Sequence, residues 1–224
     1  MPTPPPFDPR QVPVIAVDTA LPKVPAARLQ TADLRRRFAN PPVWSPELVA
    51  ESRFSDRAPM AASVLVPLVM REQLTVLLTQ RTAHLSSHSG QIAFPGGKRD
   101  ASDADDVATA LREAQEEIGL DSAHVEILGS LPIYSTGSAF HVTPVIALVQ
   151  PGHTIIANAH EVDAVFDVPL AFLMDPANHR HHEVEFAGAK RHWLSMPYQD
   201  GDSERFIWGA TAGMLRNLYR FLMA

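Results

Sequence analysis

GGKRDASDADDVATALREAQEEIGL, residues 96–120, is the most informative stretch of this 224-residue chain. Apolar or small side chains recur at helical spacing between residues 103 and 118, which predicts an amphipathic helix. Gly119 then supplies the residue type that commonly ends a helix. The stretch therefore predicts a short helix packed on a core, between a glycine-containing loop and a glycine stop.

Three glutamates project from one side of this predicted helix. Glu113, Glu116 and Glu117 stand at i, i+3 and i+4, which brings their carboxylates close together. A divalent cation would offset the repulsion, and Mg²⁺ commonly joins carboxylates to phosphate oxygens. The alternative is a solvated helix face on which Arg112 forms an ordinary i,i+4 pair with Glu116.

The flanking sequence predicts a layered α/β domain. Apolar, β-branched runs at 61–70 and 74–81 are typical of a strand pair, and 91–97 predicts a brief strand that stops at Pro95 and the two glycines. Strands mixed with two or three helices favour layers over a helical bundle or an all-β sandwich. Further strands are expected at 125–134, 143–149, 161–170, 181–188 and 191–198, and a final helix at about 207–222.

The N-terminal part of the chain is rich in proline. Prolines crowd residues 2–25, which removes backbone donors and favours extended chain over packed secondary structure. We expect a proline-rich tail at 1–30, a short helical extension at 31–58 and the main domain at 59–224.

Composition narrows the classes of partner. The formal net charge of -6 argues against a broad nucleic-acid-binding surface, and the lack of cysteine excludes disulfides, thiolate metal sites and cysteine nucleophiles. No apolar run is long enough to span a bilayer. We expect a cytoplasmic protein that binds a small-molecule substrate and neither nucleic acid nor membrane, and a homodimer is left open.

Residues 96–120 resemble the Nudix hydrolase signature. Its second half, Arg-Glu-apolar-any-Glu-Glu-any-Gly-apolar, is matched from Arg112 to Leu120. Its first half departs, because Asp103 stands where the family has Glu, and eight residues rather than seven separate it from Arg112. The role of Asp103 is therefore open.

The preceding segment is similar to the signature of the coenzyme A pyrophosphatase branch of that family. Leu-Leu-Thr-any-Arg at 77–81, Gly90 and Phe-Pro-Gly-Gly at 94–97 fall at the expected spacing. Thr82 stands where Ser or Ala is usual, and Ser86 where a second Arg is expected. Losing that Arg removes a bidentate phosphate contact, which weakens the expectation of coenzyme A but not of pyrophosphate hydrolysis.

The resemblance implies a fold, a metal and a reaction. The fold would be an α/β (α+β) sandwich, with a mixed β-sheet between helices, and Mg²⁺ or Mn²⁺ would bind Glu113, Glu116 and Glu117. The reaction would be hydrolysis of coenzyme A or acyl-coenzyme A to 3′,5′-ADP and (acyl-)4′-phosphopantetheine. ADP-ribose or another nucleoside diphosphate derivative is the alternative substrate, and a non-catalytic nucleotide-binding sensor is the alternative of another class.

Catalysis is expected from Glu116, Arg112 and Glu161. A carboxylate beside a cation takes the proton of the attacking water, and Arg112 is expected to hold a glutamate in position. Glu161 precedes a strand-like run, where Nudix enzymes often supply a further carboxylate from a loop. A surface glutamate is the alternative.

Substrate contacts are expected around the glycines. Arg81 and His88 have side chains suited to phosphate, Lys98 adds a cation, and Gly96 and Gly97 let the backbone approach phosphate or metal closely. A simple turn is the alternative for the glycines, and a polar loop position is the alternative for His88 and Lys98.

Three further histidines, His179, His181 and His182, form a cluster outside these motifs. They have no carboxylate motif at matching spacing, so we predict a solvated loop-to-strand junction rather than a metal site.

Overall fold

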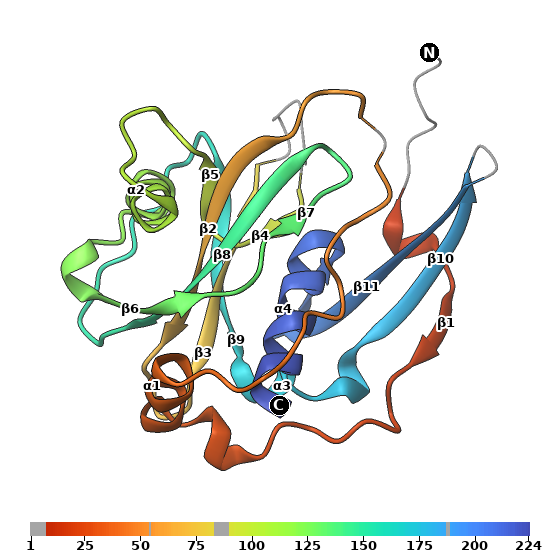
Figure 1. Ribbon diagram of the computed structural model, residues 1–224, viewed down its shortest axis with the longest axis horizontal. Coiled ribbons are helices and arrows are strands. Elements are labelled where there is room, and N and C mark those ends of the chain that lie inside the picture. Colours follow the sequence, from red (N-terminus) through yellow and green to blue (C-terminus); the bar gives the residue numbers. More distant parts are fainter. Residues whose placement is uncertain (1–7, 54, 83–89, 187–188) are drawn as a thin grey trace.

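A mixed β-sheet lies at the centre of the computed structural model, which describes residues 8–53, 55–82, 90–186 and 189–224 (Figure 1). Its strands are β2 (Met60–Val69), β3 (Thr75–Arg81), β4 (Ile92–Ala93), β5 (Gly96–Lys98), β6 (Val125–Ser130), β7 (Tyr134–Ser135), β8 (Phe140–Val149) and β9 (Val162–Pro169). The path runs β4-β3-β2-β8-β6, with β5 paired to β2, β7 to β8 and β9 to β3. Only β2 and β8 pair in parallel among the described strands.

Helices cover both faces of this sheet. On β2, Leu65 and Val69 pack in the core beneath α2 (Asp106–Ile118), whereas Val66 and Leu68 pack in the core beneath α4 (Gly209–Met223). This alternation follows from the period of two in a strand, and a strand apolar at nearly every position is buried on both faces. The predicted α/β/α sandwich with a mixed sheet is confirmed.

The helix α2 begins later than the sequence pattern suggested. Asp105 caps its first turn by accepting a hydrogen bond from the Ala108 amide at 2.8 Å. Gly119 ends it in the left-handed conformation, with φ of 66°, as predicted.

A second, four-stranded sheet covers the outer side of α4 (Figure 1). Its strands are β1 (Val14–Val17), β10 (Arg180–Phe186), β11 (Ala189–Asp200) and β12 (Ser203–Trp208), paired in the order β1-β10-β11-β12. Leu194, Met196 and Ile207 join its inner face to the α4 core. The last helix was predicted to begin at about residue 207, but Ile207 and Trp208 end β12, a strand that the charged residues before them did not suggest.

The segment before Thr31 is packed, contrary to the expectation of a tail without packed secondary structure. Val24 is 4% exposed, and the Tyr219 hydroxyl donates to the Pro22 carbonyl at 2.8 Å. Prolines flank β1 but do not interrupt it, so its backbone pairs with β10. The division of the chain at residues 30 and 58 stays a prediction. Short helices here are η1 (Pro9–Gln11), η2 (Ala26–Leu29) and the predicted α1 (Thr31–Ala39), and later ones are η3 (Ser122–His124), α3 (Leu170–Leu173) and η4 (Pro176–Asn178).

Burial of His179 and His182, two of the three clustered histidines, corrects the prediction of a solvated junction. His179 is 0% exposed, and its Nε2 lies 2.8 Å from the Leu173 carbonyl; burial lowers its pKa to about 4. His182 is also buried, with Nε2 2.8 Å from the Ser195 hydroxyl. The prediction was wrong because the N-terminal segment and α4 cover this junction.

The N-terminal packing predicts that removal of residues 1–30 destabilises the protein. The deletion strips β1 from its sheet and the Val24 side chain from the core, which should lower the free energy of unfolding by at least about 2 kcal/mol. Urea unfolding of the truncated and full chains measures the difference. Equal stability of the two proteins would show that these contacts contribute nothing.

Candidate active site

The helix α2 lies directly on the short strand β5. At Gly97 an added Cβ would overlap the Glu113 carboxylate, so this carboxylate rests against the glycine backbone. The Gly96 amide donates to Glu117 Oε2 at 3.2 Å. Contrary to the expected brief strand that stops at the glycines, Gly96 and Gly97 continue into β5 and pair with β2. The lack of a side chain at Gly97 gives the Glu113 carboxylate room, and at Gly96 it lets β5 approach Ser63 and Val64 of β2 closely.

Arg112 joins most of the acidic groups of the site. Its Nη1 lies 3.0 Å from Glu113 Oε1 and 3.0 Å from Glu116 Oε2. Its Nε and Nη2 form a two-point contact with the two Asp103 oxygens, each at 2.9 Å, and Nη2 also donates to the Lys98 carbonyl. The guanidinium therefore contacts both glutamates, and its predicted role of holding a glutamate in position for catalysis stays a prediction.

Asp103 is the site residue whose role the sequence left open. Its side chain is 5% exposed, and besides Arg112 it accepts hydrogen bonds from the Thr109 hydroxyl and the Asp100 amide. The Arg112 guanidinium, helped by these donors, holds the pKa of Asp103 well below its usual range. An aspartate with one extra residue of spacing thus reaches Arg112. The two residues are nine positions apart, which is not a spacing that brings side chains together on one helix, so helical spacing did not predict the pair.

The three glutamates of α2 differ in exposure. The side chain of Glu117 is 5% exposed, that of Glu113 is 16% exposed and that of Glu116 is 57% exposed. Burial raises the pKa of Glu117 to about 7, against the opposing effects of the Gly96 amide and of Arg81, whose Nη1 lies 3.5 Å from Glu117. Burial also raises the pKa of Glu113, against the opposing effect of Arg112.

Glu161 belongs to the same electrostatic group, although it comes from another part of the chain. Its negative charge contributes to the raised pKa of both Glu113 and Glu117. The loop before β9 is fixed to α2 by the Asn158 amide, which donates to the Glu117 carbonyl at 2.8 Å. The Asn158 side chain also donates to Glu161 Oε1 at 3.4 Å. The structure thus brings this predicted carboxylate to the others.

The predicted substrate contacts are distributed around this group. Arg81 faces Glu117, and its Nε has no hydrogen-bond partner among the described residues. Lys98 is exposed, with its ammonium 5.9 Å from the centre of the Phe140 ring. His88 and Ser86 lie outside the described residues. The roles of all these side chains toward a substrate stay predictions.

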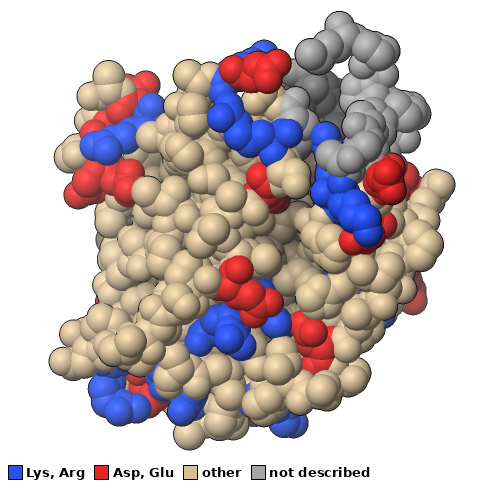
Figure 2. Space-filling model, turned by 45° about the vertical axis from the view of Figure 1, so that its right-hand side comes forward, with Lys and Arg blue, Asp and Glu red and all other residues tan. Residues whose placement is uncertain are grey.

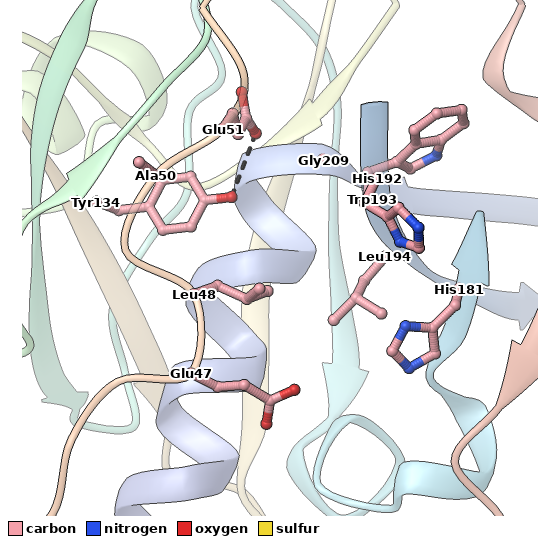
Figure 3. Close-up of a pocket in the computed structure, with 10 residues that line it drawn as sticks. All are labelled: Glu47, Leu48, Ala50, Glu51, Tyr134, His181, His192, Trp193, Leu194 and Gly209. Atoms are coloured by element: carbon pink, nitrogen blue, oxygen red, sulfur yellow. Dashed lines mark hydrogen bonds between the residues drawn. The ribbon is translucent and has the colours of Figure 1, made fainter. Parts of the chain in front are cut away.

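A small cavity of about 70 Å³ lies elsewhere, between the segment around Glu47 and the second sheet. Figure 3 shows carboxylates and a tyrosine on one wall facing histidines and a tryptophan on the other. The Glu51 carboxylate accepts from the Gly137 amide at 2.9 Å and from the Tyr134 hydroxyl at 3.4 Å, and Glu47 pairs with Arg216. These hydrogen bonds and this ion pair connect segments that are far apart in the sequence. None of the α2 carboxylates lines the cavity.

Figure 2 shows that acidic and basic side chains are intermingled in small groups on one face of the molecule, between wide uncharged areas. The described residues include no helix of the length and apolar composition needed to cross a bilayer.

A family model described as NUDIX domain matches residues 59–200. This chain belongs to the Nudix family. Proteins named uncharacterized Nudix hydrolase NudL, from Escherichia coli K12 and Shigella boydii serotype 4, are 42% identical to it over 158 residues, or 70% of this chain and 80% of theirs. Family membership makes it a Nudix hydrolase of the acid anhydride type, and the substrates of such hydrolases are nucleotide derivatives.

Solved Nudix structures are also similar to the chain. The match to an Ap4A hydrolase binary complex from C. elegans covers 53% of this chain and 85% of that chain, with 21% identity and a TM-score of 0.43. The match to a MutT/nudix family protein from Enterococcus faecalis covers 85% of this chain and 74% of that chain, with 17% identity and a TM-score of 0.44.

Nudix hydrolases generally use divalent metal ions such as Mg²⁺ or Mn²⁺. In the described part of the chain, no three His, Asp or Glu side chains are arranged to bind an ion as they stand, and Arg112 contacts Glu113 and Glu116. The donor chemistry nevertheless fits. Carboxylate oxygens are the ligands that these hard cations prefer, and Gly97 leaves room for the Glu113 carboxylate to lie against the backbone of β5.

Burial of Glu117 predicts a specific pH dependence of stability in the metal-free Nudix domain. Its folded pKa of about 7 lies above the ordinary 4.5, so between these values the folded state keeps a proton that the unfolded state releases. The stabilising contribution is therefore present below about pH 4.5 and is lost as the pH rises through about 7. Urea unfolding in EDTA at several pH values across this interval measures the loss. Glu117→Gln, which cannot ionise, should lose less stability over the interval, and equal losses would contradict the assignment.

Proposed function

We propose that this Nudix hydrolase cuts the pyrophosphate bond of coenzyme A or acyl-coenzyme A, releasing 3′,5′-ADP and (acyl-)4′-phosphopantetheine. The observation that carries the proposal is the pair of contacts made by Glu117. Arg81 and the Gly96 amide both reach this carboxylate, and they come from the two ends of the segment that resembles the coenzyme A branch. The described parts of that segment around Arg81 and Gly96 therefore adjoin the carboxylates, where they are suited to contact a substrate.

The acidic group divides into metal-binding and proton-accepting roles. Glu113, Glu116 and Glu117 would hold Mg²⁺ or Mn²⁺, which would neutralise pyrophosphate charge and lower the pKa of the attacking water. Glu161, which joins the group from a separate loop, would act as the general base or as a further ligand. Glu116 is the alternative base, because its exposed carboxylate is the most accessible of the three on α2.

Other residues position the acidic group or contact the substrate. Arg112 holds Glu113 and Glu116, and Asp103 holds Arg112. Arg81, His88 and Lys98 would supply cationic or hydrogen-bonding groups for phosphate, and the backbone of Gly96 and Gly97 would contribute to substrate binding.

Two alternatives remain distinct from this proposal. ADP-ribose or another nucleoside diphosphate derivative would use the same carboxylates, and Ser86 in place of the expected arginine weakens the case for coenzyme A. A nucleotide-binding sensor would need no catalytic carboxylates, yet all of them are retained. We also propose a cytoplasmic location, since a chain without cysteine is suited to a reducing compartment.

Product analysis by mass spectrometry tests the proposal. Incubation with coenzyme A and Mg²⁺ should release 3′,5′-ADP, and Glu116→Gln should lower the rate by about 100-fold or more without unfolding the protein, because this side chain is exposed. Glu204→Gln, at an exposed position on β12, is the matched control and should retain full activity. Parallel reactions with 3′-dephospho-coenzyme A and ADP-ribose separate the substrates. Cleavage of ADP-ribose alone would overturn the coenzyme A assignment, and cleavage of none would favour the sensor.

A further inference from the structure

Ser63, in the middle of β2, has a buried hydroxyl that the motifs do not explain. The residue is 0% exposed, and its Oγ forms no hydrogen bond with the described residues. Proteins satisfy nearly all buried polar groups, so a hydroxyl of this kind calls for a physical reason.

The register of the sheet shows which way this side chain points. Ser63 pairs with Gly97 in the antiparallel β2–β5 ladder, and directly opposed residues project to the same face. Leu65, two positions along β2, lies in the core beneath α2, which identifies that face as the α2 side. The Glu113 carboxylate covers Gly97 from the same side. The Ser63 hydroxyl is therefore a cross-strand neighbour of the position that Glu113 covers.

The next strand provides a direct comparison. Thr143 on β8 pairs with Ser63 in the parallel register, and its buried hydroxyl donates to Asp106 Oδ2 of α2 at 2.9 Å. Thr143 is thus an example of a hydroxyl on this face of the sheet that donates a hydrogen bond to a carboxylate of α2. Ser63 lies in the same row, on the side toward Glu113.

We propose that Ser63 is a positioning residue of the carboxylate site, whose hydroxyl donates a hydrogen bond to Glu113, directly or through one water, when the metal is bound. The inference rests on the proposed metal-dependent function. Glu113 Oε1 accepts from Arg112 in this structure, and a carboxylate that turns toward a cation changes its donors. Donors behind a ligating carboxylate orient it and raise metal affinity.

A packing role and a positioning role predict different effects of Ser63→Ala on metal affinity. If the hydroxyl only fills space, the substitution leaves metal affinity unchanged. If it positions Glu113, the variant binds metal more weakly, although the metal-free protein becomes more stable because an unpaired buried hydroxyl has been removed.

The test measures Mn²⁺ affinity by calorimetry without substrate, and thermal unfolding in EDTA. For Ser63→Ala we expect about a tenfold weaker Mn²⁺ affinity, with an unfolding midpoint about 2–4 °C higher. The matched control is Ser195→Ala, a serine of equal burial on the second sheet that bonds His182. It should lower the unfolding midpoint and leave Mn²⁺ affinity unchanged.

Equal Mn²⁺ affinity of Ser63→Ala and the unsubstituted protein would overturn the positioning role and leave the proposed function standing. Failure of the unsubstituted protein to bind Mn²⁺ would instead contradict the proposed function itself, and the role of Ser63 with it. In a Glu113→Gln background, Ser63→Ala should cause no further loss of affinity, and an undiminished further loss would also contradict the role.

Discussion

The repulsion among the carboxylates on α2 is the constraint on which the site depends. Glu113 and Glu117 are partly or largely withdrawn from water, which raises the pKa of both, and Glu161 adds a further negative charge. Arg112 offsets part of this charge and is itself held by Asp103. A divalent cation would offset the charge that remains, since carboxylate oxygens are the ligands that hard cations prefer.

The sheet sets where these charges lie. The apolar stripe of α2, formed by Ala110, Ala114 and Ile118, packs on the face of β2 and β8 that carries Leu65, Val69, Val145 and Val149. Glu117 falls next to that stripe, and β5 passes beneath it with two glycines. The packing of the core therefore places the Glu113 and Glu117 carboxylates against the glycine backbone of β5.

The sequence predicted the parts of the molecule that depend on local pattern. The α2 helix, its Gly119 stop, the β2–β3 pair and the mixed sheet between helices followed from periodicity and from the family resemblance. Long-range packing lay outside its reach. β1 pairs with a strand more than 160 residues later, so the residues of β1 alone did not predict this pairing. Glu113, Glu116 and Glu117 also looked alike by spacing, and their different burial emerges only once α2 is docked. Asp103 was uncertain because it departs from the family signature in residue type and in its spacing to Arg112, and its contact with Arg112 emerges only from the folded loop before α2.

The binding of a divalent cation by the α2 carboxylates is the central claim. Its most direct test is an anomalous difference map, measured at the manganese edge from crystals of the full chain grown with Mn²⁺. We expect a peak bonded to oxygens of Glu113, Glu116 or Glu117. A peak bonded to other residues, with Arg112 still on both Glu113 and Glu116, would contradict the account.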